Sequence, residues 1–350
     1  MKNNFWINNM HSSQRDVAGL IKSAAGTDVH LISSHRDYRE SIFMTADEYV
    51  QEPSKSDALS GAQYGDWLLD VAHEKRVTGI LAMRYAKELV ARKEEFERVG
   101  IRIAGGATTG WKINFCEDKF AFYTLMKKEG VPMPDTYFAS WGDKIEEACR
   151  KIEANGDVAC VKPNVGVFGR GFWVFNKNAK EFDAFSGSSK ASVDVSVYAK
   201  AHNSSNHLGV IVMKYLSGIE TSVDCVCDNG EILVHAVRKK HKFAQLISTG
   251  GKEFELAQAV AKIVGLDGLV NIQFKEDDAG NLYVLEVNTR PSGGVGWSSA
   301  VGINLPYAAY CMMNGVKTEQ KLLKEPVAIS RVDLAVQLPQ TTQKYRNGDL

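Results

Sequence analysis

The chain has 350 residues, enough for two or three domains, and its 44% hydrophobic and 24% charged residues are typical of a globular protein. The 42 acidic residues equal the 42 lysines and arginines in number, so no basic excess predicts a nucleic-acid partner. No apolar run reaches the length of a membrane span, and the start, MKNNFWINNM, lacks a signal-peptide core. The six cysteines show no metal-ligand spacing and suit a reducing compartment. We therefore expect a soluble, cytoplasmic protein that binds neither nucleic acid nor membranes.

Strand and helix alternate through the first third of the chain. Apolar periodicity predicts strands at 5–8, 29–33 and 79–83 and helices at 16–24, 64–76 and 86–99. This alternation is typical of a parallel α/β layer whose ligand-facing loops follow the carboxyl ends of the strands. The charged or titratable residues in those loops are His11, His35, Arg36 and Arg84. Their role stays open at this point, because ordinary solvated loop residues show the same pattern.

A helix that carries Lys119 comes next. Asn114 and Glu117 have the spacing of a capping box, which predicts one helix from 114 to about 129. The segment 130–134, GVPMP, ends this helix because proline cannot continue it.

A lysine and a glycine-rich loop then stand together. Lys162 lies in the otherwise apolar strand 158–163, and the loop 164–171, NVGVFGRG, follows it directly. Backbone N–H groups of such a loop can surround phosphates, and Gly166, Gly169 and Gly171 make it flexible. The loop is not a Walker A motif, which requires Gly-Lys-Ser/Thr at the start of a helix. A mobile surface hairpin is the alternative interpretation.

The last third reads as antiparallel strands and two helices. Strands are predicted at 208–216, 219–227, 231–239, 268–275 and 282–287, and helices at 254–264 and 304–313. The turn Asp228-Asn229-Gly230 is a hairpin signal between the second and third of these strands. EDDAGN, at 276–281, predicts a second hairpin between the last two strands.

Polar side chains gather on the last strand. Glu286 and Asn288 are two residues apart, so their side chains leave the same face, and hairpin pairing brings Gln273 next to Glu286. Their oxygens suit a hard cation such as Mg²⁺. Arg290 follows, and its guanidinium can hold a phosphate or carboxylate. The alternative interpretation is a buried salt bridge between Glu286 and an arginine.

In this order and spacing, the elements from about 1 to 316 resemble the ATP-grasp superfamily of carboxylate–amine ligases. The matching features are Lys119 in a helix, VKP around Lys162, the glycine loop, MKYLSGIETSVD at 213–224, Gln273 and EVNTR at 286–290. The resemblance implies an α/β and α+β fold, in which a parallel N-terminal domain precedes an ATP-grasp unit of two subdomains. The implied divisions are 1–110, 111–325 with a lid at about 135–213 and a core at about 214–325, and an extension or tail at 326–350.

The resemblance also implies roles for individual residues. The expected cofactors are ATP and Mg²⁺, with Lys119, Lys162 and the three loop glycines at the phosphates. Adenine is expected near Lys214, Tyr215 and Leu216, and the ribose at Glu220. Gln273, Glu286 and Asn288 are expected to hold the metal. Arg290, together with Arg238, is expected to steady the transferring phosphoryl group.

Two positions depart from the usual family pattern. Met213-Lys214 stands where the hinge strand usually carries an acid, and Gln273 stands where the first metal ligand is more often Asp or Glu. Gln273 is instead similar to the carbamoyl-phosphate-synthetase-like branch. The segments ISSHRDY at 32–38, TADEYVQEP at 45–53 and 64–84 resemble the ATP-grasp group associated with tellurite-resistance and stress operons.

The leading functional prediction is a ligase that forms an acylphosphate and passes the acyl group to an amine, releasing ADP and phosphate. A phosphotransferase that stops at a phosphorylated product is one alternative, and a non-catalytic ATP-binding sensor or scaffold is another. The expected partners are a small-molecule carboxylate and an amine, and a homodimer is left open. A carboxylase is disfavoured because no biotin-carrier segment is found.

Overall fold

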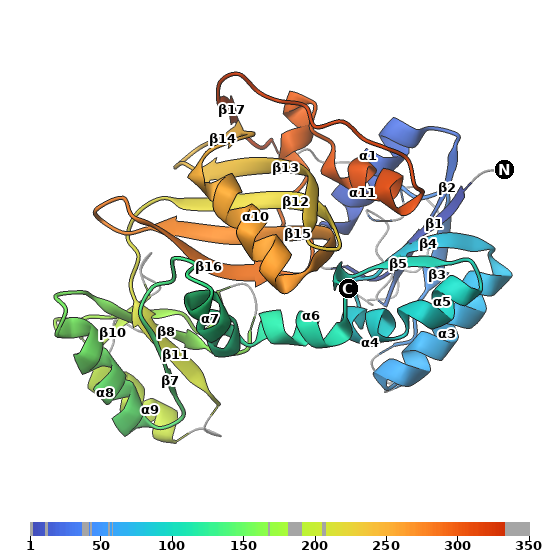
Figure 1. The fold of residues 1–350 in the computed structure, drawn as a ribbon. Coiled ribbons are helices and arrows are strands. Elements are labelled where there is room, and N and C mark those ends of the chain that lie inside the picture. The colour runs from blue at the N-terminus through green and yellow to red at the C-terminus, as the bar shows by residue number, and fades with distance from the viewer. Residues whose placement is uncertain are drawn as a thin grey trace, which may run out of the picture.

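The structure, a computed structural model, describes residues 3–10, 13–36, 42, 44–54, 57, 59–166, 169–180, 191–204 and 208–332. Its strands form three sheets, of five, five and seven strands. In Figure 1 the first sheet (blue) lies on the right, the second (green) at the lower left, and the third (yellow to orange) between them. This mixture of a parallel sheet and antiparallel sheets confirms the predicted α/β and α+β fold.

The first sheet is entirely parallel, as predicted, and has the order β3-β2-β1-β4-β5. Its strands are β1 (Asn3–Ile7), β2 (Val29–His35), β3 (Glu48–Gln51), β4 (Val77–Leu81) and β5 (Arg102–Ala104). Its helices are α1 (Gln14–Ala25), α3 (Gly61–Glu74), α4 (Ala86–Ala91) and α5 (Lys93–Arg98). The chain moves outward from β1 through β2 to β3 and then returns to place β4 on the other side of β1. Strand order therefore reverses between β1 and β4, and ligands bind at such points in open α/β sheets.

The single helix predicted for 86–99 is wrong, because α4 and α5 are separate helices that meet at Arg92. The Arg92 guanidinium reaches back to α3, where it donates to the Ala62 carbonyl at 3.0 Å and contacts Asp66 at 2.8 Å. It also forms two hydrogen bonds with Glu95. These contacts fix the side chain that separates the two helices.

The predicted helix 114–129 is also two helices, α6 (Gly110–Glu117) and α7 (Lys119–Lys128). Asn114 is not an N-cap, because it lies inside α6, whose N-cap is Thr109. Asp118 ends α6 and caps α7 by accepting from the Ala121 amide at 2.9 Å. A short polar residue at this position satisfies a backbone N–H that has no partner within the helix.

The second sheet has the order β10-β9-β8-β11-β7. Its strands are β7 (Thr136–Ala139), β8 (Ala159–Pro163), β9 (Trp173–Phe175), β10 (Ser192–Val193) and β11 (Val210–Lys214). Helices α8 (Gly142–Glu153) and α9 (Val195–Asn203) pack against it around one hydrophobic core. The opposite face carries Cys160, Ile211 and Met213 in a smaller cluster.

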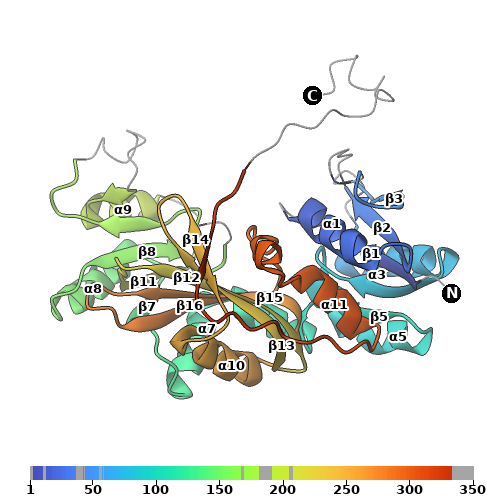
Figure 2. The same ribbon diagram turned by 90° about the horizontal axis from the view of Figure 1, so that it is seen from above.

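The third sheet has the order β16-β15-β12-β13-β14-β17, and β6 (Gly106–Ala107) pairs with β15 outside this path. Its strands are β12 (Glu220–Asp228), β13 (Glu231–Lys240), β14 (Gln245–Ser248), β15 (Leu266–Glu276), β16 (Leu282–Asn288) and β17 (Val327–Ile329). Helix α10 (Lys252–Val264) covers one face, while α11 (Leu305–Met313) and α1 share a core with the other. Helices α1 and α11 lie side by side in both views (Figures 1 and 2). A short 3₁₀ helix, η2 (Trp297–Val301), precedes α11.

Both predicted hairpins are present. Asn229 and Gly230 have φ angles of 50° and 89° in the β12–β13 turn, as tight hairpin turns require. The expected extension from 326 begins instead with an ordered strand, because β17 pairs with β14. The last ten residues, predicted as a tail, lie outside the described residues. Among those described, no helix combines the length and apolarity that crossing a membrane requires.

Candidate active site

A cavity of about 530 Å³ lies between the second and third sheets. Its lining comes from the start of α7, strand β8 and the β8–β9 loop, the end of β11 and the residues after it, strands β12, β13, β15 and β16, and the loop after β16. Most of the predicted site residues line it, namely Lys119, Lys162, Gly166, Gly169, Tyr215, Leu216, Glu220, Gln273, Glu286, Asn288 and Arg290. Predicted site residues as far apart in sequence as Lys119 and Arg290 therefore line one cavity.

The β15–β16 pairing builds the predicted oxygen cluster. Gln273 lies opposite Glu286 and Asn271 opposite Asn288, with a β-bulge after Gln273. The pairing of Gln273 with Glu286 is thus confirmed. The set contains one carboxylate and neutral amides, which suits a hard cation that also takes ligands from a bound phosphate. The described residues contain no group of three or more His, Cys, Asp and Glu that could hold a metal by themselves.

Three cations surround Glu286. Its carboxylate lies 3.3 Å from the Lys162 ammonium, so the salt bridge considered as an alternative is formed with a lysine. Burial by itself raises the pKa of Glu286, but the charges of Lys162, Lys119 and Arg290 outweigh burial and hold this pKa below its ordinary value. Glu286 is therefore ionised at neutral pH.

The cations themselves are partly desolvated. Burial lowers the pKa of Lys119, and the neighbouring charge of Lys162 lowers it further, while Glu286 acts in the opposite direction. Burial also lowers the pKa of Arg290, again opposed by Glu286. Cations held in this way gain from an added anion, which replaces the water that burial has removed.

The start of α7 and the glycine loop are held together through Asn164. The Asn164 side chain accepts from the Phe120 amide at 2.8 Å and donates to Asp118 at 3.0 Å. The Lys119 ammonium donates to the Gly166 carbonyl at 2.8 Å. Val167 and Phe168, within the same loop, lie outside the described residues. Lys119 is therefore positioned by the loop that also borders the cavity.

The other end of the cavity is apolar. Phe172, Met213 and Leu285 line it near Tyr215. The Tyr215 amide donates to the Val158 carbonyl at 2.7 Å, which fixes the chain just after β11. Glu220 lies at the rim and is hydrogen-bonded to Lys240. This part of the cavity therefore combines apolar side chains with one carboxylate.

Three predicted residues do not line the cavity. Lys214 points away from it and forms ion pairs with Asp157 at 3.0 Å and Asp277 at 3.4 Å. Gly171 has a φ of 74°, and a Cβ there would lie 2.9 Å from Pro163, so its role is in the turn of the loop. Arg238 is buried in the adjoining sheet, with its side chain 5% exposed.

Arg238 is part of a buried network that sequence reasoning missed. Its guanidinium donates to Asp224 at 2.9 Å, Gln245 at 2.6 Å and Ser292 at 2.9 Å. The other Asp224 oxygen accepts from the Asn271 amide at 2.9 Å. The network therefore ties β12 and β13 to β15 and to the loop that follows Arg290.

The same network reaches the oxygen cluster. The side-chain amide of Asn288 donates to the side-chain oxygen Oδ1 of Asn271 at 3.2 Å, and Asn271 is fully buried. Asp224 alternates with apolar neighbours in the sequence TSVDCVC, and a buried acid at such a position requires partners. That signal could have identified Asp224, although not its partners.

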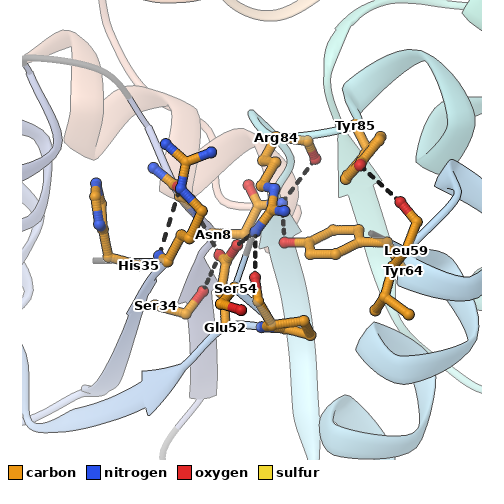
Figure 3. Close-up of polar contacts among 12 residues, drawn as sticks. Asn8, Ser34, His35, Glu52, Ser54, Leu59, Tyr64, Arg84 and Tyr85 are labelled. Atoms are coloured by element: carbon orange, nitrogen blue, oxygen red, sulfur yellow. Dashed lines mark hydrogen bonds and ion pairs between the residues drawn. The ribbon is translucent and has the colours of Figure 1, made fainter. Parts of the chain in front are cut away.

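A second polar cluster lies at the carboxyl edge of the first sheet, away from this cavity. Figure 3 shows Ser34, His35, Glu52 and Arg84 among its members. His35 and Arg84 are thus brought together with other polar residues, and Arg36 follows directly on His35. His11 lies outside the described residues.

Part of the chain matches one family model, and longer stretches align with known proteins. Residues 207–334 match the family model described as "ATP-grasp in the biosynthetic pathway with Ter operon". Over 323 residues the chain is 26% identical to the carbamoyl phosphate synthase large chain of Mycobacterium sp. (strain JLS). That alignment covers 87% of this chain and 27% of the relative, so the chain spans about a quarter of the length of the curated relatives it matches.

Solved structures share the fold at low sequence identity. The N5-carboxyaminoimidazole synthetase of Staphylococcus aureus in complex with ADP aligns with a TM-score of 0.66 and 15% identity, covering 94% of this chain and 82% of that one. The biotin carboxylase domain of Hydrogenobacter thermophilus 2-oxoglutarate carboxylase, solved with MgADP, ADP and bicarbonate, aligns with a TM-score of 0.65 and 18% identity. It covers 91% of this chain and 72% of that one.

Proposed function

Because the chain belongs to the ATP-grasp superfamily, we propose that it is an ATP- and Mg²⁺-dependent carboxylate–amine ligase. One observation carries the proposal. Lys119, Lys162 and Arg290 face Glu286 and its neighbouring amides across one cavity. This arrangement neutralises and positions the polyphosphate and the acyl group, which is the main demand of phosphoryl transfer.

The nucleotide fits the cavity in one direction. Its phosphates lie towards Lys119, Lys162 and the loop that contains Gly166, Gly169 and Gly171. Its adenine lies against the apolar end, where the chain following Lys214 presents the backbone of Tyr215 and Leu216. Glu220, at the rim, accepts from the ribose hydroxyls.

The metal position is proposed at Gln273, Glu286 and Asn288. Mg²⁺ bound there would neutralise charge that develops on the phosphates. The contact with Lys162 fixes the position of the Glu286 carboxylate. Asn271 accepts a hydrogen bond from the Asn288 side chain and is itself held by Asp224, so the two residues orient the Asn288 amide. Asn271 lines the cavity as well, and it is a further oxygen donor at this position.

The reaction begins when an oxygen of the substrate carboxylate attacks the γ-phosphorus of ATP and the bond to the ADP oxygen breaks. Arg290 is placed to stabilise the negative charge of the transferring group. The amine nitrogen then attacks the acyl carbon, inorganic phosphate leaves, and the nitrogen loses a proton. Ser292 and Gly293 line the cavity beside Arg290, and Arg238 fixes Ser292. Arg238 is therefore proposed as a positioning residue.

We also infer the division of the chain at about residues 110 and 325, with a lid at 135–213 and a core at 214–325. Strands of the first sheet end at Ala104, those of the second run from Thr136 to Lys214, and β12 begins at Glu220. This division supports a lid that closes on the nucleotide. A cytoplasmic location and a homodimer are consistent proposals, since the similar biotin carboxylase domain is described as a dimer.

The test is a product balance. Candidate acids and amines are supplied with ATP and Mg²⁺, and ADP and inorganic phosphate are measured together. A ligase forms both in equal amounts only when acid and acceptor are both present. Phosphate retained on a product identifies a phosphotransferase, and ATP binding without turnover in any mixture identifies a sensor.

Two variants sharpen this test. Lys162→Ala should remove most phosphoryl transfer. Arg290→Ala should lower the rate by roughly 10²- to 10³-fold and leave ATP affinity within a small factor. Weaker ATP binding with normal turnover at saturation would make Arg290 a nucleotide-binding residue.

A further inference from the structure

Polar side chains are concentrated at the carboxyl edge of the first sheet. Asn8 follows β1, Ser34 and His35 end β2, and Glu52 follows β3, and all four are buried. Arg84 follows β4, across the point where strand order reverses. Figure 3 shows Asn8, Ser34, Glu52 and Arg84 directed towards one another, with the His35 ring to one side. The edge of a sheet at such a reversal is where open α/β folds bind ligands.

Glu52 is the centre of this cluster. One carboxylate oxygen accepts from the Asn9 amide and from the Ser34 hydroxyl, both at 2.7 Å. The other accepts from Arg84 at 2.9 Å. The Glu52 side chain has no exposed surface, whereas that of Arg84 is 16% exposed. Glu52 therefore holds an arginine that still reaches the surface of the cluster.

Arg84 is fixed in one orientation. Its guanidinium lies 5.0 Å from the ring centre of Tyr64 and 5.2 Å from that of Tyr85. Among the described residues, its two hydrogen bonds, to Glu52 and to the Pro53 carbonyl, both leave from Nη1. These contacts hold the guanidinium in place, and the bonds to Glu52 and Pro53 use neither Nε nor Nη2.

The backbone beside Arg84 is strained. Tyr85 has a φ of 54°, in the left-handed region that residues other than glycine seldom adopt. Its hydroxyl donates to the Leu59 carbonyl at 2.9 Å, which retains the ring beside the guanidinium. Strain of this kind persists where surrounding contacts enforce it, and it is frequent at ligand clamps.

We propose that Arg84 anchors a second ligand site, which binds a small oxyanion, a carboxylate or a phosphate. A buried ion pair contributes little net stability compared with apolar residues of the same size, so stability alone does not account for Glu52 and Arg84. The pair does orient a guanidinium, whose remaining N–H groups match the geometry of a carboxylate or phosphate. His35 and Arg36 at the end of β2 add basic side chains to the same edge.

The loop after β16 runs from the candidate active site to the elements that follow β1 in the first sheet. Ser292 and Gly293 line the ATP cavity, and a Cβ added at Gly296 would lie 3.4 Å from Leu20 and 3.6 Å from Asp16, both in α1. Met10, after β1, belongs to the same hydrophobic core as Val295. The bound anion would be an ionised group of a substrate other than ATP, and this interpretation rests on the proposed function. The binding itself does not.

The experiment is an NMR titration of the full chain with acetate and, separately, with inorganic phosphate. The Nε–H signal of Arg84 and the indole N–H signal of Trp67 are followed, because the Trp67 ring lies 5.3 Å from the Tyr64 ring. We expect both signals to shift and saturate with at least one anion. The anion that binds more tightly distinguishes a carboxylate from a phosphate ligand.

Variants make the result specific. Arg84→Lys keeps a cation beside Glu52 but lacks the guanidinium, and the Trp67 signal should then report roughly tenfold weaker anion binding. Arg98→Lys, at an exposed arginine of the same domain, should bind as the unmodified chain does. The double variant Glu52→Gln, Arg84→Gln leaves no buried charge unpaired and should lose saturable binding.

Shifts that do not saturate with either anion, or unchanged binding by Arg84→Lys, would overturn the proposal. The titration needs neither ATP nor turnover. A failure here is therefore distinguishable from a failure of the ligase proposal, which is judged by ADP and phosphate release.

Discussion

Asp224→Asn tests whether the buried network supports the candidate metal position. Asp224 accepts from Arg238 through one oxygen and from Asn271 through the other, both at 2.9 Å. The substitution keeps the size of the side chain, but it removes the charge and turns one acceptor into a donor. That new donor must face the N–H of either Arg238 or Asn271. Arg238 is then a buried cation that has lost its ion-pair partner.

The expected loss of stability in Asp224→Asn depends on the burial of the ion pair and on the hydrogen bonds that remain. Removing one member of a buried ion pair costs about 3–5 kcal/mol. Gln245 and Ser292 still accept from Arg238, and one amide oxygen remains at position 224, so we expect a value of about 3 kcal/mol. Supporting residues of a metal site typically change metal affinity by about 10- to 100-fold. We therefore also expect roughly tenfold weaker Mg²⁺-dependent ATP binding.

Urea unfolding followed by circular dichroism gives the stability, and ATP titrations with and without Mg²⁺ give the binding. The matched control is Asp228→Asn, at the exposed end of the same strand, which should change stability by less than about 0.5 kcal/mol. A double-mutant cycle with Arg238→Met should show coupling between the two positions. A stability loss below about 1 kcal/mol for Asp224→Asn, equal to that of the control, would refute the reasoning.

Three further predictions concern single residues. Glu286→Gln should lower turnover by roughly 10²-fold and alter its Mg²⁺ dependence. The control Glu231→Gln, at an exposed acid, should change neither. Unchanged kinetics of Glu286→Gln would show that Glu286 does not belong to the proposed metal position. Gly106→Ala should destabilise the chain by several kcal/mol in urea unfolding, because a Cβ would lie 2.1 Å from the Thr289 carbonyl oxygen. Gly100→Ala has a similar positive φ with nothing within 4 Å, so equal losses would exclude the close contact as the cause. Asp277, although burial raises its pKa, has that pKa lowered from 3.8 to about 2 by hydrogen bonds from Asn281 and by Lys214. Because the folded pKa is the lower one, ionised Asp277 stabilises the fold above pH 4, and this contribution is lost as pH falls towards 2. Acid unfolding of Asp277→Asn should therefore lack that part of the pH dependence, while Asp278→Asn, at the exposed neighbour, should retain it.

Sequence patterns predicted the elements whose periodicity is strong and local. The parallel first sheet, both C-terminal hairpins and the pairing of Gln273 with Glu286 follow from apolar alternation and turn residues. The breaks at Arg92 and Asp118 did not follow, because each depends on partners distant in sequence, on α3 in one case and at Asn164 in the other. Short strands such as β3 and β6 also escaped, since so few residues carry no periodic signal.

The residues of the candidate site were likewise predictable from sequence only in part. Residues with characteristic chemistry beside glycines or in apolar strands, such as Lys162 and Glu286, were identified from sequence and line the cavity. Lys214 was expected there because it adjoins Tyr215, but strand alternation directs successive side chains to opposite faces, and the pairing of Lys214 with Asp157 and Asp277 accords with that. Asn271 was missed because its partner Asp224 lies on another strand, and register is visible only in the folded sheet.

The three-residue strand β17 has a consequence for how this protein behaves in solution. It pairs along the outer side of β14, from Gln245 to Ile247, and so occupies the row of N–H and C=O groups that β14 would otherwise present. An uncovered edge strand is a template on which another chain can add. β17 presents a new edge, but one too short to extend far. Shortening the chain before Val327 would therefore keep every residue that lines the cavity and expose β14, and we expect such a variant to self-associate as its concentration rises.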